Sequence, residues 1–242
     1  FYAYIERGSF ASARVVVPIV NSWLKPATVL DVGCGRGAWL KVWRDVGVIE
    51  AFGLDGEYVL PDELHIPDTD FYGHDLRGAV DLGKKFDLVT SFEVAEHLDP
   101  SSSENFVKTL TRHSDKVLFS AATVGQGGEH HINEKPLEFW RTLFRDRGYI
   151  AHDFVRPLVS GCKTVEPWYR FNMLLYVHES KLDSLPQVVS SSRLEDGVKI
   201  PDYSDTFWRL RSALVRLLPR GLVNWIAMTN AKRKASQRRA MI

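Results

Sequence analysis

The stretch that most constrains the fold is TVLDVGCGRGAWL, residues 28–40, in which an apolar run leads to Asp31 and then to alternating glycines. These glycines are Gly33, Gly35 and Gly37. Glycine has no Cβ atom, so the backbone here is free to adopt left-handed conformations and to approach a ligand closely. In an open α/β sheet, the turn between the first strand and the first helix is a common ligand-binding place. The stretch therefore predicts an α/β fold that holds a ligand at this turn.

Short apolar runs alternate with helical patterns along the first 150 residues, which is typical of a parallel sheet with helices on both faces. The expected parallel strands are residues 28–32, 51–55, 71–75, 86–92 and 116–121. Helices are expected at residues 12–24, 37–47, 101–113 and 135–148. Two further runs, residues 149–157 and 170–178, follow each other without a crossover helix and predict an antiparallel pair. The expected fold is a doubly wound, mostly parallel, seven-stranded sheet with an antiparallel last strand.

Changes in composition divide the chain into three parts. Residues 1–178 carry the strand and helix pattern and form the predicted domain. Residues 179–202 are rich in Ser, Asp, Pro and Val and are interpreted as a linker. Residues 203–242 form a basic appendage, with two short amphipathic helices expected on either side of Pro219 and a frayed end at residues 232–242.

The net charge of +1 hides an uneven distribution of charged residues. Nine of the 31 Lys and Arg residues and none of the 30 Asp and Glu residues follow residue 205, so the rest of the chain carries −8. An acidic body does not suit nucleic-acid binding, which needs clustered basic side chains, and we expect no such partner. The basic tail suits an anionic membrane surface or a partner protein. Packing of the tail on the body, as a lid over the ligand, is the equal alternative.

The cysteine content favours a reducing compartment. Cys34 and Cys162 are the two cysteines, too few for a disulfide framework or a cysteine-rich zinc site. No apolar run approaches the roughly 20 residues that span a bilayer. The sequence therefore predicts a cytoplasmic protein, with a peripheral contact to the inner face of the membrane through the tail as the further expectation.

The identity of the ligand at the glycines has two candidate answers. GCGRGA satisfies the relaxed dinucleotide pattern G-x-G-x-x-G/A, and Asp55 lies near the usual position of a ribose-binding acid, so NAD is one alternative. Asp31, two residues before the first glycine, would repel the negative charge of a pyrophosphate. Its carboxylate favours a ligand with a positively charged ammonium or sulfonium group. Two further acidic stretches, HDL at residues 74–76 and SFEVAEHL at residues 91–98, follow later strands and reach the same sheet edge.

Three of these stretches resemble the class I S-adenosylmethionine-dependent methyltransferases. VLDVGCGRG resembles their first motif, GLDGEYV their acidic loop after strand two, and FDLVTSFEVAEHL their strand-four motif. The seven-strand count with a reversed last strand is also their Rossmann-like architecture. The resemblance covers residues 15–177 and implies S-adenosylmethionine as cofactor.

The resemblance also implies roles for individual residues. The methionine part of the cofactor is expected against the glycine loop, with its amino group near Asp31. The ribose hydroxyls are expected on the carboxylate of Asp55, which accepts two donors at once. Phe92 and Glu93 are expected to line the pocket near the sulfonium. The complete set of expected cofactor-binding residues is Asp31, Gly33, Gly35, Arg36, Gly37, Asp55, Gly56, Asp75, Leu76, Phe92 and Glu93, with Asp75 at the adenine amino group and Leu76 on the adenine ring.

A glycine- and histidine-rich stretch, GQGGEHHINEKPLEFW at residues 125–140, follows the fifth expected strand. Methyl transfer to a hydroxyl needs a base that works near neutral pH, and histidine suits this role. The expected base is His131, then His130, then His97. A metal site is the rival interpretation, because His, Glu and Asn ligate divalent ions. No ligand spacing such as H-E-x-x-H is present, so no metal is predicted.

The same stretch, together with PWYRFNMLLYV at residues 167–177, resembles a methyltransferase subgroup found with bacterial glycan and surface-polysaccharide enzymes. That subgroup commonly reads G-G-x-x-H-x-N-E and later W-Y-R-x-N, and this chain departs from it at Phe171, where a polar residue is expected. The resemblance implies an acceptor site formed by Asn133, Glu134, Trp168, Tyr169 and Arg170. The predicted function is O-methylation of a sugar or other small polar hydroxyl acceptor. Methylation of nitrogen, lipid or protein, against which the missing N-P-P-Y motif argues, and a NAD-dependent dehydrogenase are the alternatives.

Overall fold

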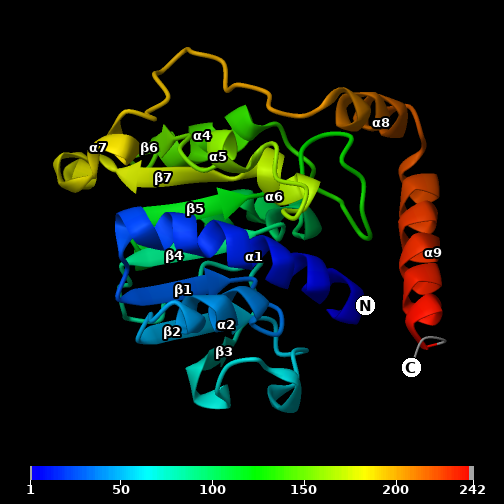
Figure 1. The fold of residues 1–242 in the computed structure, drawn as a ribbon, viewed down its shortest axis with the longest axis horizontal. Coiled ribbons are helices and arrows are strands. Elements are labelled where there is room, and N and C mark those ends of the chain that lie inside the picture. Colours follow the sequence, from blue (N-terminus) through cyan, green and yellow to red (C-terminus); the bar gives the residue numbers. More distant parts are fainter. Residues whose placement is uncertain (1, 240–242) are drawn as a thin grey trace.

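The computed structural model describes residues 2–239, and these contain a seven-stranded sheet in the order β3-β2-β1-β4-β5-β7-β6 (Figure 1). The strands are β1 (Thr28–Val32), β2 (Glu50–Asp55), β3 (Phe71–Gly73), β4 (Leu88–Phe92), β5 (Lys116–Ser120), β6 (Tyr149–His152) and β7 (Leu174–His178). The first five strands are mutually parallel, and β7 runs antiparallel to both β5 and β6. The predicted sheet, with its reversed last strand, is therefore confirmed.

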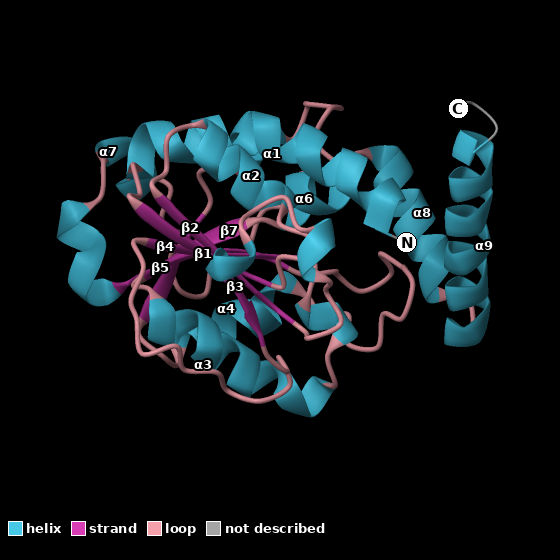
Figure 2. Cartoon of the chain, turned by 90° about the horizontal axis from the view of Figure 1, so that it is seen from below, coloured by secondary structure: helices cyan, strands magenta, loops and turns pink. Residues whose placement is uncertain are grey.

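Helices cover both faces of the sheet, as Figure 2 shows, with α1 and α2 on one side and α3 and α4 on the other. The α-helices are α1 (Tyr2–Leu24), α2 (Ala38–Asp45), α3 (Ser103–His113), α4 (Leu137–Arg145), α5 (Arg156–Val159), α6 (Pro167–Asn172), α7 (Gln187–Ser190), α8 (Thr206–Arg216) and α9 (Arg220–Arg239). Short 3-10 helices are η1 (Pro61–Glu63), η2 (Asp68–Asp70), η3 (Ala95–His97), η4 (Pro100–Ser102) and η5 (Glu179–Ser184).

Two hydrophobic cores form because neighbouring residues of a strand point to opposite faces of the sheet. In β1, Val29 packs into the core under α1 and α2, while Leu30 packs into the core above α3 and α4. The second core contains Phe144 stacked on Tyr176, with ring centroids 3.9 Å apart. Both faces of the central strands are buried, which explains why these strands read as continuous apolar runs.

The structure corrects the expected last pair of strands. The run at residues 149–157 is a strand only as far as His152, and the run at residues 170–178 is a strand only from Leu174. Between them, α6 begins at Pro167, whose missing N–H and fixed φ suit the first position of a helix. Trp168, Tyr169 and Arg170 therefore lie on a helix and not along a strand edge.

The segment interpreted as a linker, residues 179–202, is packed against the edge of the sheet. It contains η5 and α7, and Val189 and Ile200 are buried in the two cores. Arg141 of α4 holds it by donating hydrogen bonds to the carbonyls of Leu194, Glu195 and Val198. These contacts tie the start of the C-terminal appendage to the domain.

The appendage consists of α8 and α9, which Figure 1 shows beyond the carboxyl ends of the parallel strands. The predicted break at Pro219 is confirmed, because α8 ends at Arg216 and α9 begins at Arg220. Residues 232–239, which were expected to fray, continue α9. Within the described part of the chain, no helix combines the length and the apolar character needed to cross a membrane.

Candidate active site

A cavity of about 1160 Å³ opens where the parallel strands end. At one end it is bordered by the loop after β1, the tip of β2 and the loop after β3. At the other end it is bordered by η3, the histidine-rich loop after β5, α6 and the appendage. We refer to these as the glycine end and the histidine end of the cavity. Residues from distant parts of the sequence meet here because all five parallel strands point to this edge.

The glycine end depends on a backbone that only glycine adopts readily. Gly33, Gly35 and Gly37 have φ values of +80°, +53° and +83°. A Cβ atom on Gly33 would lie 2.2 Å from a methyl of Val94, so the loop also packs too closely for a side chain there. Gly33 and Gly35 line the cavity, whereas Gly37 lies behind it as the N-cap of α2.

Asp55, at the tip of β2, holds the glycine loop in place. One carboxylate oxygen accepts the N–H of Gly35 at 2.6 Å. The other accepts the N–H of Gly56 at 2.6 Å and the hydroxyl of Tyr58 at 2.5 Å. Asp55 and Gly56 both line the cavity. The Asp55 carboxylate therefore faces the cavity while it accepts hydrogen bonds from the protein.

Asp31 lies at the floor of the glycine end and is 2% exposed. The register of β1 and β4 places it beside Thr90, whose hydroxyl donates to it at 2.7 Å. Burial, together with the negative charge of Asp55, raises the pKa of Asp31 to about 7. A positively charged group bound here would restore the charged carboxylate.

The loop after β3 supplies Asp75 and Leu76 to the cavity wall. Asp75 is exposed, and Arg77 donates three side-chain hydrogen bonds to it at 2.6 to 2.9 Å. These bonds lower the pKa of Asp75 to about 2. Leu76 is 7% exposed and presents an apolar surface beside it.

Arg36 connects the glycine loop to the first helix. Its guanidinium pairs with Glu6 of α1 at 2.6 Å and with Glu63 of η1 at 3.2 Å. Glu6 also contacts His65 at 3.0 Å. Arg36 and Glu6 both line the cavity, so this charged network forms part of its wall.

Aromatic side chains form the wall between the two ends. Phe92, the last residue of β4, packs against Trp39 with ring centroids 4.3 Å apart, and against Tyr169 at 6.1 Å. The Tyr169 hydroxyl lies 3.1 Å from the Ser9 hydroxyl. Trp168 lines the cavity beside Tyr169. The expected positions of Phe92, Trp168 and Tyr169 at the cavity are therefore observed.

Glu93 is held at the cavity wall by two amide side chains, Gln126 and Asn172, whose role the sequence did not predict. Its backbone has φ +57°, a strained value for a residue other than glycine. Gln126 donates to one of its carboxylate oxygens at 2.5 Å, and Asn172 donates to the Gln126 carbonyl oxygen at 2.8 Å. Asn172 is the final asparagine of the W-Y-R-x-N pattern, which was the available signal. Burial raises the pKa of Glu93.

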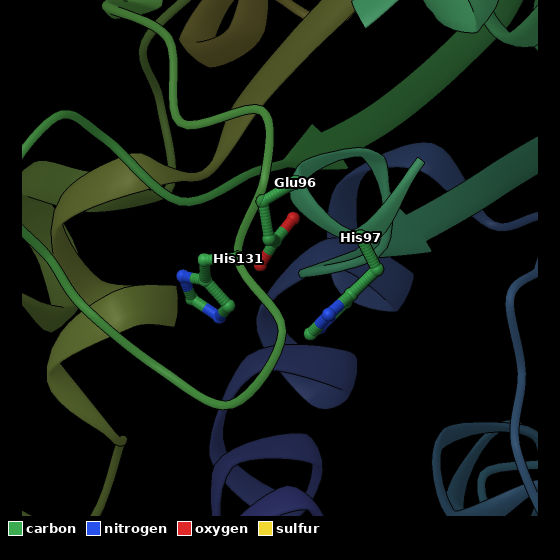
Figure 3. Close-up of side chains that lie close together, drawn as sticks. All are labelled: Glu96, His97 and His131. Carbon is green, nitrogen blue, oxygen red and sulfur yellow. The ribbon is translucent and has the colours of Figure 1, made fainter. Parts of the chain in front are cut away.

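Glu96, His97 and His131 converge on one space at the histidine end (Figure 3). Glu96 is fully buried, and among the described residues neither of its carboxylate oxygens has a hydrogen-bond partner. Burial and the charge of Glu93 raise the pKa of Glu96 well above its ordinary value. Burial and the neighbouring His131 lower the pKa of His97 to about 4, so its imidazole is neutral. Glu96 was not among the predicted site residues, although SFEVAEHL placed it one residue before His97.

His131 and His130 are adjacent in sequence but differ in surroundings. The Nδ1 atom of His131 lies 3.0 Å from Glu134, which also accepts the N–H groups of Gly125 and Gly127. His130 is exposed, has φ +56°, and donates its backbone N–H to Asn224 of α9. Both histidines line the cavity, and only His131 is oriented by a carboxylate.

Three predicted acceptor-binding residues do not face the cavity. Asn133 is buried and donates to the carbonyl of Ala95 and the hydroxyl of Ser103, so it fastens the loop to η3. Arg170 is 8% exposed and donates to the carbonyl of Ser160. Glu134 anchors the glycine-rich loop and His131, as described above. The structure thus places these three residues behind the cavity lining, where they support the loop and α6.

The appendage closes part of the histidine end. Trp208 and Arg211 of α8 and Ala227 and Asn230 of α9 line the cavity. Arg211 donates to the Gln126 carbonyl at 2.6 Å. The described part of the tail therefore packs over the cavity, which the sequence analysis named as one of two alternatives.

Comparison with known proteins gives a consistent picture. Residues 12–153 match the model of a family described as "Methyltransferase domain". No curated protein matches the chain. Among solved structures, the sugar N-methyltransferase from Streptoalloteichus is 16% identical, with a TM-score of 0.55 over 74% of this chain and 92% of that one. The methyltransferase domain of a bacterial Hen1 is 18% identical, with a TM-score of 0.53 over 71% and 98%.

A third solved structure, the magnesium protoporphyrin IX methyltransferase from Synechocystis with bound SAM, is 20% identical, with a TM-score of 0.52 over 72% of this chain and 81% of that one. At these identities the similarity concerns the fold. Two of the three names state an acceptor, magnesium protoporphyrin IX in one and a sugar in the other, so the shared fold does not define the acceptor.

Proposed function

This chain belongs to the methyltransferase domain family and is an S-adenosylmethionine-dependent methyltransferase, and we propose that it methylates a hydroxyl of a sugar or another small polar acceptor. The observation that carries the proposal is one cavity that the glycine end and the histidine end line together. Its volume of about 1160 Å³ exceeds the roughly 300–1,000 Å³ of pockets that hold one ligand. There is room for a cofactor and an acceptor together.

The glycine end suits the cofactor in charge and in shape. Asp31 lies where the positively charged amino group of S-adenosylmethionine would find a buried carboxylate, and Asp55 faces the ribose position. Asp75 and Leu76 offer an acid and an apolar surface for the adenine. Phe92 and Glu93 then lie at the passage to the histidine end, where the sulfonium would sit.

The histidine end suits a hydroxyl acceptor. The acceptor oxygen attacks the methyl carbon in line, the bond between carbon and sulfur breaks with its electron pair going to sulfur, and S-adenosylhomocysteine leaves. The hydroxyl proton passes to the imidazole of His131, which lies in the cluster of Glu96, His97 and His131. Holding the two reactants in this geometry supplies much of the rate enhancement.

The walls of the histidine end favour a sugar-like acceptor. Trp168, Tyr169 and Trp208 provide flat surfaces for a ring, and Arg211 brings positive charge to the same side. An amphipathic ring with several hydroxyl groups matches such a combination of aromatic surfaces and polar groups.

An acceptor screen tests this proposal. The chain is incubated with methyl-labelled S-adenosylmethionine and a panel of nucleotide sugars, free glycans, amines and peptides, and products are identified by mass spectrometry and NMR. The proposal expects an O-methyl ether on a sugar hydroxyl. Labelled N-methyl products, or label transferred only to peptides, would contradict it. Thermal unfolding with S-adenosylhomocysteine and with NAD serves as the cofactor control, with a shift expected from the first alone.

The appendage supports a second part of the proposal, a peripheral contact with an anionic membrane surface. In α8, Trp208 and Arg211 face the cavity, while Phe207, Leu210 and Leu214 are between 62% and 76% exposed. The region after residue 205 has nine Lys and Arg residues and no acid. Exposed apolar groups among basic ones are typical of helices that lie on anionic lipid.

Vesicle sedimentation tests the contact. We expect the chain to bind vesicles containing phosphatidylglycerol and not vesicles of phosphatidylcholine alone, with binding weakened by salt. The variant Leu210→Ser/Leu214→Ser should lose binding while keeping its thermal shift with S-adenosylhomocysteine. Equal sedimentation with both vesicle types, or with neither, would contradict the membrane contact.

A further inference from the structure

Two buried carboxyl groups at the end of β4 border the cavity without a basic side chain paired to them in the described part of the chain. Glu93 and Glu96 lie three residues apart, and both border the cavity. In the described structure, both oxygens of Glu96 and one oxygen of Glu93 are buried without a partner by strict hydrogen-bond geometry, and the two carboxyl groups lie next to each other. Among the described residues, neither carboxyl pairs with a lysine or an arginine. A buried carboxyl group without a basic partner stays neutral unless a cation accompanies it, so a bound cation would find two carboxyl groups ready to ionise beside it.

Two imidazole rings complete the arrangement. One ligand atom from each of Glu96, His97 and His131 lies within 4.8 Å of the others. Atoms bound to one ion at about 2.1 Å are at most about 4.2 Å apart, so small side-chain rotations close the set around an ion. In Figure 3 the Glu96 carboxylate and both rings point into the same space. Glu96 and His97 come from η3, and His131 comes from the loop after β5.

Hydrogen bonds from neighbouring residues orient these side chains, and such outer contacts are common around metal ions. Glu134 contacts Nδ1 of His131 at 3.0 Å, which leaves Nε2 as the free ring nitrogen. A carboxylate that orients a histidine in this way is typical of metal sites. Gln126 holds one oxygen of Glu93 and leaves the other without a partner. The supporting contacts thus satisfy one side of each residue and leave the side toward the cavity open.

We propose that Glu96, His97 and His131, with Glu93 as an additional carboxylate, bind a divalent cation of the first transition series. The donor set of two imidazoles and two carboxylates suits ions such as Mn²⁺, Co²⁺ or Zn²⁺ better than Mg²⁺, which prefers oxygen ligands alone. The sequence predicted no metal because it contains no set of ligands at a spacing such as H-E-x-x-H. Here the ligands come from two segments that the fold brings together.

The role of the ion rests on the proposed function, whereas its binding does not. The acceptor hydroxyl binds the ion, and its pKa falls as it does for metal-bound water. Its proton passes to solvent, the alkoxide oxygen attacks the methyl carbon, and the carbon–sulfur bond breaks with its electron pair going to sulfur. The products are a methyl ether and S-adenosylhomocysteine, and the ion is unchanged. His131 is then a ligand that positions the acceptor and not the base.

Titration of the tag-free, full-length chain with MnCl₂, followed by the electron paramagnetic resonance signal of free Mn²⁺, tests the binding. We expect one Mn²⁺ per chain, and at least a tenfold loss of affinity in each of the variants His97→Ala, His131→Ala and Glu96→Gln. His178→Ala is the matched control, because this histidine ends β7, contacts Ser180 and does not line the cavity, and the variant should retain the wild-type affinity within about twofold. Titration with S-adenosylhomocysteine checks that each variant is folded.

The outcomes separate this inference from the proposed function. Absence of stoichiometric Mn²⁺ binding, or equal affinity in the wild type and in His97→Ala and His131→Ala, would overturn the cation site. If the sugar hydroxyl is still methylated in the presence of EDTA, the proposed function stands without the ion, and the cation site loses its role. If the ion binds but no hydroxyl is methylated, the site stands and the proposed function falls.

Discussion

The two ends of the cavity differ in whether the chain itself supplies hydrogen-bond partners to their carboxyl groups. At the glycine end, both Asp55 oxygens already accept hydrogen bonds from the chain, and the glycine loop is locked by backbone contacts. At the histidine end, Glu96 is buried with neither oxygen satisfied. The chain itself thus satisfies Asp55 at the first end, while at the second end the described residues leave the Glu96 carboxyl group without a partner. The difference supports the proposal that the glycine end positions a cofactor and the histidine end carries the reaction.

Gly33→Ala should have the largest effect, by breaking the glycine end alone. The added methyl would lie 2.2 Å from Val94, and φ is +80°. We expect at least a 100-fold loss of affinity for S-adenosylhomocysteine by calorimetry. Gly47→Ala is the matched control, since its φ is +95° with nothing within 4 Å, and only a loss of stability of about 1 kcal/mol is expected there. Equal losses of affinity in the two variants would mean that close packing at Gly33 is irrelevant.

Gly128→Ala should break the histidine end alone. Its φ is not positive, so the backbone tolerates alanine, but the added Cβ would lie 2.2 Å from Nε2 of His131. Displacement of the ring should lower kcat about 100-fold with the acceptor identified by the screen. Affinity for S-adenosylhomocysteine should remain within twofold of the wild type. Retention of full turnover would show that the position of His131 does not matter.

Asp31→Asn should change how the free energy of unfolding depends on pH. The pKa of Asp31 in the folded chain is about 7, above its ordinary value, so the native state binds an extra proton between about pH 4 and pH 7. The free energy of unfolding without ligand should therefore fall as pH rises through this window, and the variant should lack that fall.

Cofactor affinity should show the reverse trend. Ionised Asp31 attracts the ammonium group of S-adenosylhomocysteine, and its ionised fraction rises about tenfold between pH 6 and pH 8 for a pKa of about 7. Calorimetry should thus find an affinity that rises up to about tenfold across this range in the wild type and stays flat in Asp31→Asn. A pH-independent affinity in the wild type would argue that Asp31 does not contact the ammonium group.

Asn133→Ala should have the smallest effect on activity. Asn133 is 2% exposed and donates hydrogen bonds to Ala95 and Ser103. Its loss should lower the free energy of unfolding by about 1–3 kcal/mol, because buried partners are left unsatisfied. The KM for the acceptor should change less than twofold. A large increase in KM at unchanged stability would instead restore Asn133 as an acceptor contact.

The glycine end was largely predictable from the sequence, because its features are local. The spacing of Gly33, Gly35 and Gly37 defines the loop, and the order of strands places Asp55 beside it. The histidine end was predicted only in part. Whether Asn133 or Glu96 faces the cavity depends on hydrogen-bond partners far away in the chain, which spacing does not reveal.

The helix α6 illustrates the same limit. Its apolar and aromatic residues suit a strand as well as a helix, and Pro167 decides in favour of the helix only in the context of the preceding turn. As a result, Arg170 points to Ser160 and not to the acceptor. The appendage was predicted as two helices from periodicity, but the Arg211 contact over the cavity depends on tertiary packing.

The most direct test is a crystal structure of the chain with S-adenosylhomocysteine and MnCl₂, recorded at the manganese absorption edge. We expect the cofactor product against Gly33, Gly35 and Asp55, and one anomalous peak among Glu96, His97 and His131. A cofactor bound in the glycine end with the manganese peak elsewhere would contradict the division of the cavity into a positioning end and a reacting end. A cofactor product bound outside the glycine end would contradict the site as a whole.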